Sequence, residues 1–373
     1  MGIQENLSSI TIYSITFLVL IAIIFFVEPE NLINKLFELG LWGILLLVLL
    51  YSIDLCVRAY RWKILLIAQG VHLSVKSLIS PVVSALAINL FTIARAGETA
   101  RLYALKRNHN TTFSDTLSSI VIEQILSIIG LLVVISSSLF LLTSSFYQIE
   151  NSELIQQLVI ILFLISTCVL LVLGLMMIKP EFTKRLIGIF PPSVEKRVSS
   201  AYEAFLLGLT DLRSKPLLLI QGLITSVIIW VIEGVMLYVI AFSVFPAFEI
   251  IDLPWSIAAS CVGNITFIIP LLPGAMGQYE VVVALILINS PNYPPGTYAA
   301  IVALIDRVAK SVILGFFGGY AILRLGGKEL LQMRKDYSST SDSTNRREIS
   351  TNTENVNESL IDDKDTDQAT TKE

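Results

Sequence analysis

The stretch that decides the fold is NLFTIARAGETAR, which runs from Asn89 to Arg101 between two apolar runs. Its charged residues and its glycine do not suit a helix that faces lipid. A second broken stretch, from Asn264 to Glu280, also starts at an asparagine and ends at a glutamate, with several prolines and glycines between them. We expect the two stretches to face each other across a bilayer and to form a transport site together.

The composition is that of an integral membrane protein. Of 373 residues, 54% are hydrophobic and 15% are charged, and the mean hydropathy is +0.75. A soluble domain is nearer one quarter charged. The net charge of −4 depends on the C-terminal end: residues 336–373 hold ten acidic and four basic residues, a net −6, so the rest is about +2. That end has almost no large apolar residue and is predicted to be disordered.

Apolar runs and loop charges predict the topology. Lys and Arg are concentrated in segments 58–76, 95–107 and 179–215, whereas segments 143–155, 246–254 and 290–296 have none. By the positive-inside rule the first group and both termini are cytoplasmic. Six runs are long enough for full transmembrane helices: 10–27, 40–57, 117–142, 156–178, 217–245 and 298–323.

Each of two further apolar segments has flanking loops that agree in their content of basic residues. Segment 78–104 has basic flanks on both sides, and segment 255–289 has flanks without basic residues. We expect each to enter and leave the membrane by the same face, as two oppositely oriented re-entrant helical hairpins in an inverted repeat. The alternative is two ordinary pairs of short spans.

The chain then divides into five parts. These are an N-terminal transmembrane helix and external loop (1–39), a first half with the cytoplasmic hairpin (40–142), a transmembrane helix and cytoplasmic connection (143–216), a second half with the external hairpin (217–327), and a disordered acidic cytoplasmic tail (328–373).

Polar and chain-breaking residues at membrane depth are the candidates for a substrate-binding site. An ionisable group inside a span costs about 2.5–3.5 kcal/mol on insertion scales, so it usually has a partner or a pathway. Arginine suits phosphate because its planar fork offers paired donors. The candidates are Arg58, Arg61, Asn89, Arg95, Gly97, Glu98, Arg101, Glu123, Glu233, Asn264, Pro273, Gly274, Gly277, Glu280, Arg307 and Lys310.

We assign roles by position. The arginines at 58, 61, 95 and 101 would capture a headgroup phosphate at the cytoplasmic side, and Arg307 and Lys310 would attract it from the outer side. The glutamates would compensate these charges or carry protons. The alternative is structural ion pairing within the bundle, with Arg58 and Arg61 as simple headgroup anchors. Asp306 in particular has a local partner four residues on, in Lys310.

No catalytic, metal or cofactor site is predicted. The chain has two histidines and three cysteines without ligand spacing, no nucleotide-binding glycine loop, and no soluble domain large enough for catalysis.

The motifs resemble a known family, the transmembrane region of lysylphosphatidylglycerol synthase, also called the flippase-like domain family. The resemblance covers about residues 10 to 325 and implies a lipid flippase. In bifunctional members this region moves the aminoacylated lipid while a separate soluble domain makes it, and other members stand alone or accompany glycosyltransferases. The motifs are Arg58-x-x-Arg61-Trp62, Asn89 with Arg95-x-Gly97-Glu98-x-x-Arg101, Glu123, Pro273-Gly274-x-x-Gly277-x-x-Glu280, and Arg307.

The chain departs from the family at a few positions. Ile93 stands where the family often has Pro, and Ala275 replaces a second Gly. Gln124 and Ser127 stand where an Arg and an Asp are usual. These differences bear on the headgroup that is handled more than on the fold.

We therefore predict a multi-pass protein of the cell membrane that moves an anionic phospholipid or a polyprenyl-phosphate-linked lipid between leaflets. A glycosyltransferase or lipid-modifying enzyme is a possible partner, and no nucleic acid is expected. A non-transporting scaffold for a glycosyltransferase and a membrane-embedded lipid-modifying transferase are the alternatives.

Overall fold

The computed structural model describes residues 29–92, 97–109, 113–146, 215–245, 252–267, 273–290 and 297–324, with isolated positions between 161 and 203. Most of these residues are helical, and none of them forms a strand. One compact unit ends at Ala321, and residues 322–373 form a second. The helices are α2 (Pro29–Glu38), α3 (Gly40–Ala68), α4 (Val75–Phe91), α5 (Gly97–His109), α6 (Phe113–Phe146), α10 (Pro216–Val244), α11 (Leu253–Ile265), η2 (Pro273–Ala275), α12 (Gln278–Leu287) and α13 (Thr297–Arg324).

Three of these helices are long and apolar enough to cross a membrane, namely α3, α6 and α10. Helix α13 has 28 residues and is about 42 Å long, which is enough to cross a membrane. It has three charged residues near its middle. The predicted spans at 10–27 and 156–178 and the acidic tail lie outside the described residues, apart from the isolated positions.

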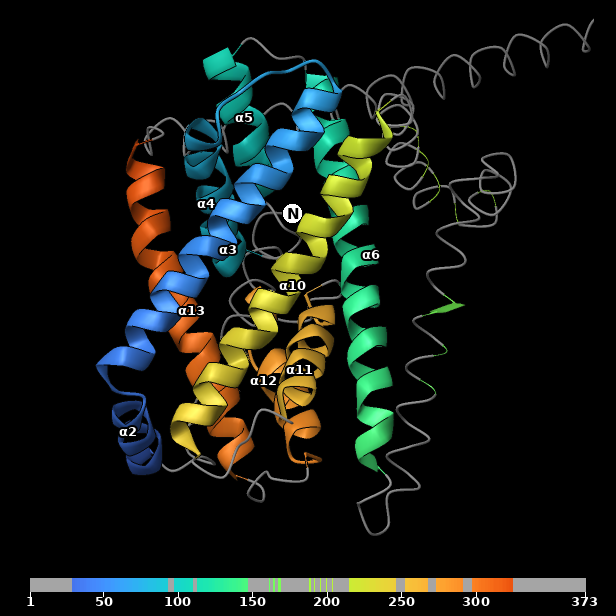
Figure 1. Cartoon of the computed structure of the whole chain (residues 1–373). Helices are drawn as coiled ribbons and strands as arrows, with labels where there is room; N and C mark the ends of the chain where they lie inside the picture. The colour runs from blue at the N-terminus through green and yellow to red at the C-terminus, as the bar shows by residue number, and fades with distance from the viewer. Residues whose placement is uncertain are drawn as a thin grey trace, which may run out of the picture. The chain divides into compact units, whose positions relative to one another are not determined.

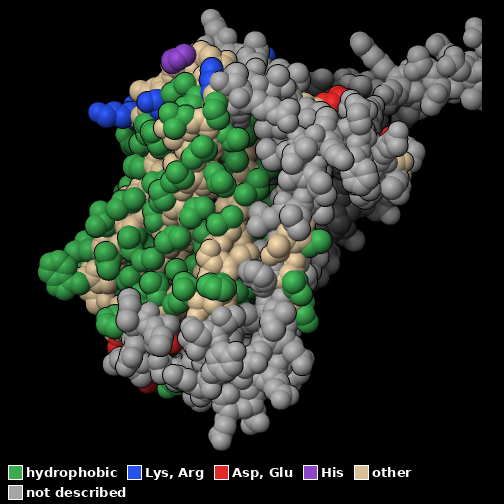
Figure 2. All heavy atoms as spheres, turned by 45° about the vertical axis from the view of Figure 1, so that its right-hand side comes forward, with side chains coloured by type: hydrophobic (Ala, Val, Ile, Leu, Met, Phe, Trp, Pro, Cys, Tyr) green, Lys and Arg blue, Asp and Glu red, His purple; other side chains and the backbone are tan. Residues whose placement is uncertain are grey.

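Large apolar side chains cover the outer face of the long helices. Trp42 of α3, Phe140 of α6 and Phe316 of α13 are each more than two-thirds exposed. Figure 2 shows one such face, with hydrophobic side chains over most of its described surface and Lys and Arg at one edge. Soluble monomers rarely expose an apolar surface of this extent, so this one suits contact with lipid.

Helices α4 and α5 form an antiparallel pair. Gly97 at the start of α5 lies against α4, where an added Cβ would stand 2.0 Å from the backbone oxygen of Ala85. Further along α5, Leu105 packs with Leu78 near the start of α4. The Asn89 carboxamide oxygen accepts a hydrogen bond of 2.7 Å from the Gly97 backbone N–H and fastens the two helices together.

Helices α11 and α12 form a second antiparallel pair. Gly263, near the end of α11, lies against Tyr279 and Val283 at the start of α12. At the other end, the Ser290 hydroxyl donates to the Asp252 carboxylate at 2.6 Å. Both pairs therefore occupy the segments in which hairpins are predicted.

The two pairs lie at opposite ends of the helix bundle, and their tips meet (Figure 1). Gly274 in η2 faces the backbone oxygen of Leu90 in the last turn of α4, where an added Cβ would stand 2.6 Å away. Its φ of +59° is in the left-handed region, which favours glycine. A side chain at this position would separate the two tips.

The long helices enclose the pairs. Leu131, Ile135 and Leu142 of α6 pack against Trp255 and Ala258 of α11. On the other side of the bundle, α3 packs through Trp62 and its neighbours against α4 and α5. Each hairpin is thus held by buried apolar contacts with a long helix.

Helix α3 extends further than the predicted span at 40–57. It continues to Ala68, so the basic segment from Arg58 to Lys63 is part of the helix rather than a loop. Arg61 is buried, with 3% of its surface exposed. Hydropathy falls at these residues, but partners on other helices allow the helix to continue through them.

Candidate functional site

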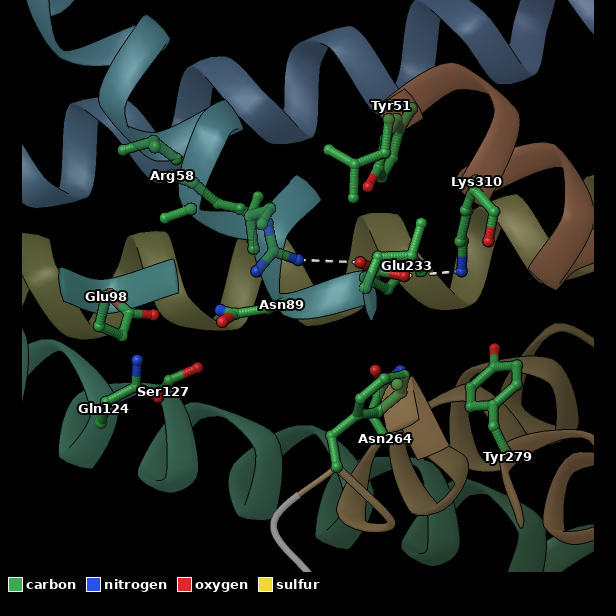
Figure 3. A pocket seen from close by; sticks show the side chains of 18 of the residues that line it. Tyr51, Arg58, Asn89, Glu98, Gln124, Ser127, Glu233, Asn264, Tyr279 and Lys310 are labelled. Atoms are coloured by element: carbon green, nitrogen blue, oxygen red, sulfur yellow. Dashed lines mark hydrogen bonds and ion pairs between the residues drawn. The ribbon is translucent and has the colours of Figure 1, made fainter. Parts of the chain in front are cut away.

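A cavity of about 220 Å³ lies where the hairpin tips meet the long helices. Figure 3 shows its side chains converging from α3, α4, α5, α6, α10, α11, α12 and α13. The lining residues that carry charge are Arg58, Arg61, Glu98, Arg101, Glu123, Glu233, Asp306, Arg307 and Lys310.

The first cluster of charges, Arg61–Glu123–Arg101–Glu98, joins α3, α5 and α6. The Glu123 carboxylate accepts from Arg61 at 2.9 Å through one oxygen and from Arg101 at 2.6 Å through the other. Arg101 also donates to Glu98 at 3.0 Å. Two cations face two carboxylates, so this cluster is neutral overall.

Both arginines of this cluster have additional contacts. The Arg61 guanidinium donates to the Ser226 hydroxyl of α10 at 3.0 Å. The Arg101 guanidinium lies 4.1 Å from the centre of the Trp62 ring, a cation–π contact. Glu98 has the most exposed side chain of the four, at 20%, and its carboxylate reaches toward the cavity.

The second cluster, Asp54–Arg58–Glu233–Lys310–Asp306, joins α3, α10 and α13. Glu233 lies at its centre, with one oxygen 2.8 Å from Arg58 and the other 2.6 Å from Lys310 (Figure 3). Arg58 also binds Asp54 at 2.6 Å, and Lys310 also binds Asp306 at 2.9 Å. Three carboxylates face two cations, which leaves a formal excess of one negative charge.

The ends of this second cluster differ. The Tyr279 hydroxyl of α12 donates to Asp306 at 2.7 Å. Asp54 is completely buried, and its Oδ1 has no hydrogen-bond partner among the described residues. A buried carboxylate oxygen without a donor is costly, because its desolvation is not compensated.

Arg307 forms a third group at the tip of the α11–α12 hairpin. It donates to the backbone oxygen of Gly274 and lies over the Phe267 ring at 4.9 Å. Its Nε is 3.9 Å from Glu280, whose other oxygen accepts from the Gly277 N–H at 2.7 Å. The charge of Arg307 therefore lies beside a loop that bends at glycines.

Most of the predicted site residues come together here. The lining includes Arg58, Arg61, Asn89, Glu98, Arg101, Glu123, Glu233, Asn264, Gly274, Arg307 and Lys310.

The other predicted residues have different positions. Gly97 closes the α4–α5 pair, and the Glu280 side chain caps the start of α12 at Gly277. Pro273 opens η2. Arg95 lies outside the described residues.

Sequence reasoning missed several residues of the site. Asp54 is not among the predicted site residues, although its spacing of four from Arg58 is that of a helical ion pair. Tyr51, Tyr279, Gln124, Ser127 and Trp230 also line the cavity. Gln124 and Ser127 are two of the four positions at which we expect the sequence to differ from the family that it resembles.

Among the described side chains, no group of three or more His, Cys, Asp and Glu residues is arranged to hold a metal ion. The carboxylates of the cavity are separated by arginine or lysine side chains. What the cavity offers chemically is a set of paired cations that an anion of suitable shape can reach.

The helical architecture, the apolar outer face and the charged internal cavity define an integral membrane protein with a polar site inside its helix bundle. The model of the lysylphosphatidylglycerol synthase TM region matches residues 12–318, and the chain belongs to this lipid-related family. No curated protein and no solved structure gives a significant match.

Proposed function

We propose that this protein is a lipid translocase that moves an anionic phospholipid or a polyprenyl-phosphate-linked lipid between the leaflets of the cell membrane. The observation that carries the proposal is the internal cavity, where five cationic side chains converge between two short helical pairs. A site of this kind suits a phosphate that must leave one interface and reach the other.

Helix lengths support re-entrant pairs. Helices α5 and α11 have 13 residues and α12 has ten, which correspond to about 20 Å and 15 Å. The hydrocarbon core is about 30 Å thick, so these helices do not span it. With the predicted loop charges, α4–α5 would enter from the cytoplasm and α11–α12 from outside.

The element order supports an inverted repeat. Helix α3, the short pair α4–α5 and helix α6 are followed later by α10, the short pair α11–α12 and α13. Broken helices at corresponding positions of two inverted halves commonly form the substrate site of a transporter. In this arrangement both halves contribute charged residues to one cavity, and the N- and C-termini are cytoplasmic.

The charge arrangement supports an anionic headgroup. Each cation in the two clusters is bound to a carboxylate on another helix, and those contacts can be exchanged for contacts with a phosphate of the same charge. Glu98 is the most exposed of these carboxylates and has Arg101 as its only partner among the charged cavity residues that the structure describes. Headgroup entry at Arg101 would displace Glu98 first.

The test is a leaflet-accessibility assay in liposomes that contain the purified protein and fluorescent phospholipid or polyprenyl-phosphate analogues. Dithionite bleaches only label that reaches the outer leaflet, so translocation appears as loss of the protected fraction. Arg101→Ala and Arg307→Ala should abolish translocation while the protein still inserts. Lys106→Ala is the matched control, because Lys106 is an exposed cation on the same helix as Arg101.

Full activity of Arg101→Ala and Arg307→Ala would refute the proposal. Product formation from a soluble donor in detergent would instead indicate a transferase. A scaffold would tolerate loss of the cavity charges and would move no lipid.

A further inference from the structure

We infer that the second cluster binds one proton, at Asp54, and that this proton moves with the anionic headgroup. The inference deepens the proposed function, on which it rests, by naming the coupling ion. It starts from a charge imbalance: Asp54, Glu233 and Asp306 carry three negative charges, and Arg58 and Lys310 carry two positive charges.

The geometry identifies the atom that takes the proton. Both Glu233 oxygens bind cations, and Asp306 Oδ2 accepts from the Tyr279 hydroxyl. Asp306 Oδ1 has no hydrogen-bond partner among the described residues, but it lies 2.9 Å from the Lys310 ammonium. The Oδ1 of Asp54 has no hydrogen-bond partner among the described residues, while its Oδ2 binds Arg58 at 2.6 Å. A proton on Oδ1 removes the excess charge and leaves the contact with Arg58 in place.

Among the described residues, Arg58 and Lys310 are the cations that form salt bridges with the carboxylates of this cluster. The titratable and charged groups near this cluster are Tyr51, Arg58 and Arg61 on α3, Glu233 on α10, Cys261 on α11, Tyr279 and Glu280 on α12, and Asp306 and Lys310 on α13. A bare metal ion such as sodium needs several oxygen ligands around one point. Here Arg58 and Lys310 lie between the carboxylates, so a proton fits the site better than a metal ion.

Protonation of Asp54 changes what Arg58 presents to the cavity. The carboxylate becomes a neutral carboxylic acid, so Glu233 is the one remaining negative partner of Arg58 in the cluster. The potential at the cavity becomes more positive, which favours an anionic headgroup. Binding of the anion and binding of the proton therefore favour each other, as linkage requires.

The direct test is infrared spectroscopy of the full-length protein in lipid films, recorded as the pH is lowered. Wild type should gain a protonated-carboxyl C=O band of one group that Asp54→Asn lacks. Asp306→Asn should also lack this band, because the cluster then has two carboxylates for two cations. This second variant tests the inference if Asp54→Asn does not fold. Asp252→Asn should keep the band, since Asp252 is a buried aspartate bound to Ser290 outside the cavity.

Two results would overturn the inference. One is the same set of protonated carboxyls in wild type, Asp54→Asn and Asp306→Asn. The other is loss of the wild-type band when sodium replaces choline at fixed pH, which would show that a sodium ion occupies the site.

A transport measurement separates this inference from the proposed function. With one proton per lipid, a pH difference of one unit should shift the steady-state leaflet ratio of the lipid about tenfold, toward the alkaline side. Asp54→Asn should lose this shift, and the leaflet ratio reached by any lipid that the variant moves should not depend on the pH difference. A wild type that moves lipid without any shift overturns the coupling alone. A wild type that moves no lipid while the infrared band titrates keeps the proton site but overturns the proposed function, and the coupling with it.

Discussion

Replacement of Glu123 by Gln isolates the contribution of one buried charge. Glu123 lies between Arg61 and Arg101, and the side chains of all three are about 4–5% exposed. Gln has the same size and keeps one acceptor, but the cluster changes from neutral to a net +1. Two arginines then share Glu98 as their one remaining carboxylate in the cluster.

The expected loss of stability follows from this geometry. Removal of one partner from a buried ion pair costs about 3–5 kcal/mol, because the remaining charge stays buried without compensation. Water in the adjacent cavity can solvate the arginines in part, so the lower limit applies. About 3 kcal/mol corresponds to a change of roughly a hundredfold in the folding equilibrium.

The assay is thermal unfolding of the purified protein in mixed micelles, with and without an anionic phospholipid. Glu123→Gln should be less stable than wild type in zwitterionic lipid and should regain most of the loss in anionic lipid. A headgroup with a net negative charge replaces the missing charge, whereas the phosphate of a zwitterionic lipid is balanced by its own cationic group. Lys106→Ala, the exposed cation on α5, should show neither effect. Wild-type stability of Glu123→Gln, or an equal response of all three proteins to anionic lipid, would refute the reasoning.

Two further predictions test the hairpins. Gly97→Val should reduce the yield of folded protein sharply, because even a Cβ at Gly97 meets the α4 backbone at 2.0 Å. Gly315→Val should be tolerated, because the space around Gly315 is open. Size-exclusion chromatography of both variants measures the difference. Three single-cysteine variants, made in a protein without other reactive cysteines, test the topology with an impermeant thiol reagent. His72→Cys and Lys106→Cys should react from the cytoplasmic side, and Asn289→Cys should react from outside. Labelling of His72→Cys and Lys106→Cys from opposite sides would contradict a re-entrant α4–α5 pair.

Much of the fold is visible in the sequence because it depends on local signals. The apolar runs mark α6 and α10 within a few residues, and Pro and Gly mark the break between α11 and α12. Helix α3 shows the limit of this reasoning. Its last three turns carry Arg58 and Arg61, and hydropathy treats such residues as the end of a span, although buried carboxylates on other helices keep them inside the bundle.

Part of the candidate site was predictable, because ionisable residues are rare inside apolar segments and therefore stand out in the sequence. Glu123, Glu233 and Lys310 stand out for that reason and do line the cavity. Their pairing was not predictable, because the partner of Arg58 on α10 is 175 residues away along the chain. Asp54 is not among the predicted residues, and the sequence does not show that one of its oxygens has no hydrogen-bond partner, because that depends on the packing of other helices around α3.

These separations in sequence have a consequence for how the protein is made. A ribosome adds about 5–20 residues per second, so Glu233 emerges roughly 9–35 seconds after Arg58. Glu123, the partner of Arg61, follows 62 residues later, after about 3–12 seconds. During this interval α3 must enter the membrane with Asp54 as the one counter-charge of Arg58 within its own helix. Until the later helices have been made, Asp54 is therefore the carboxylate that can offset part of the positive charge of α3.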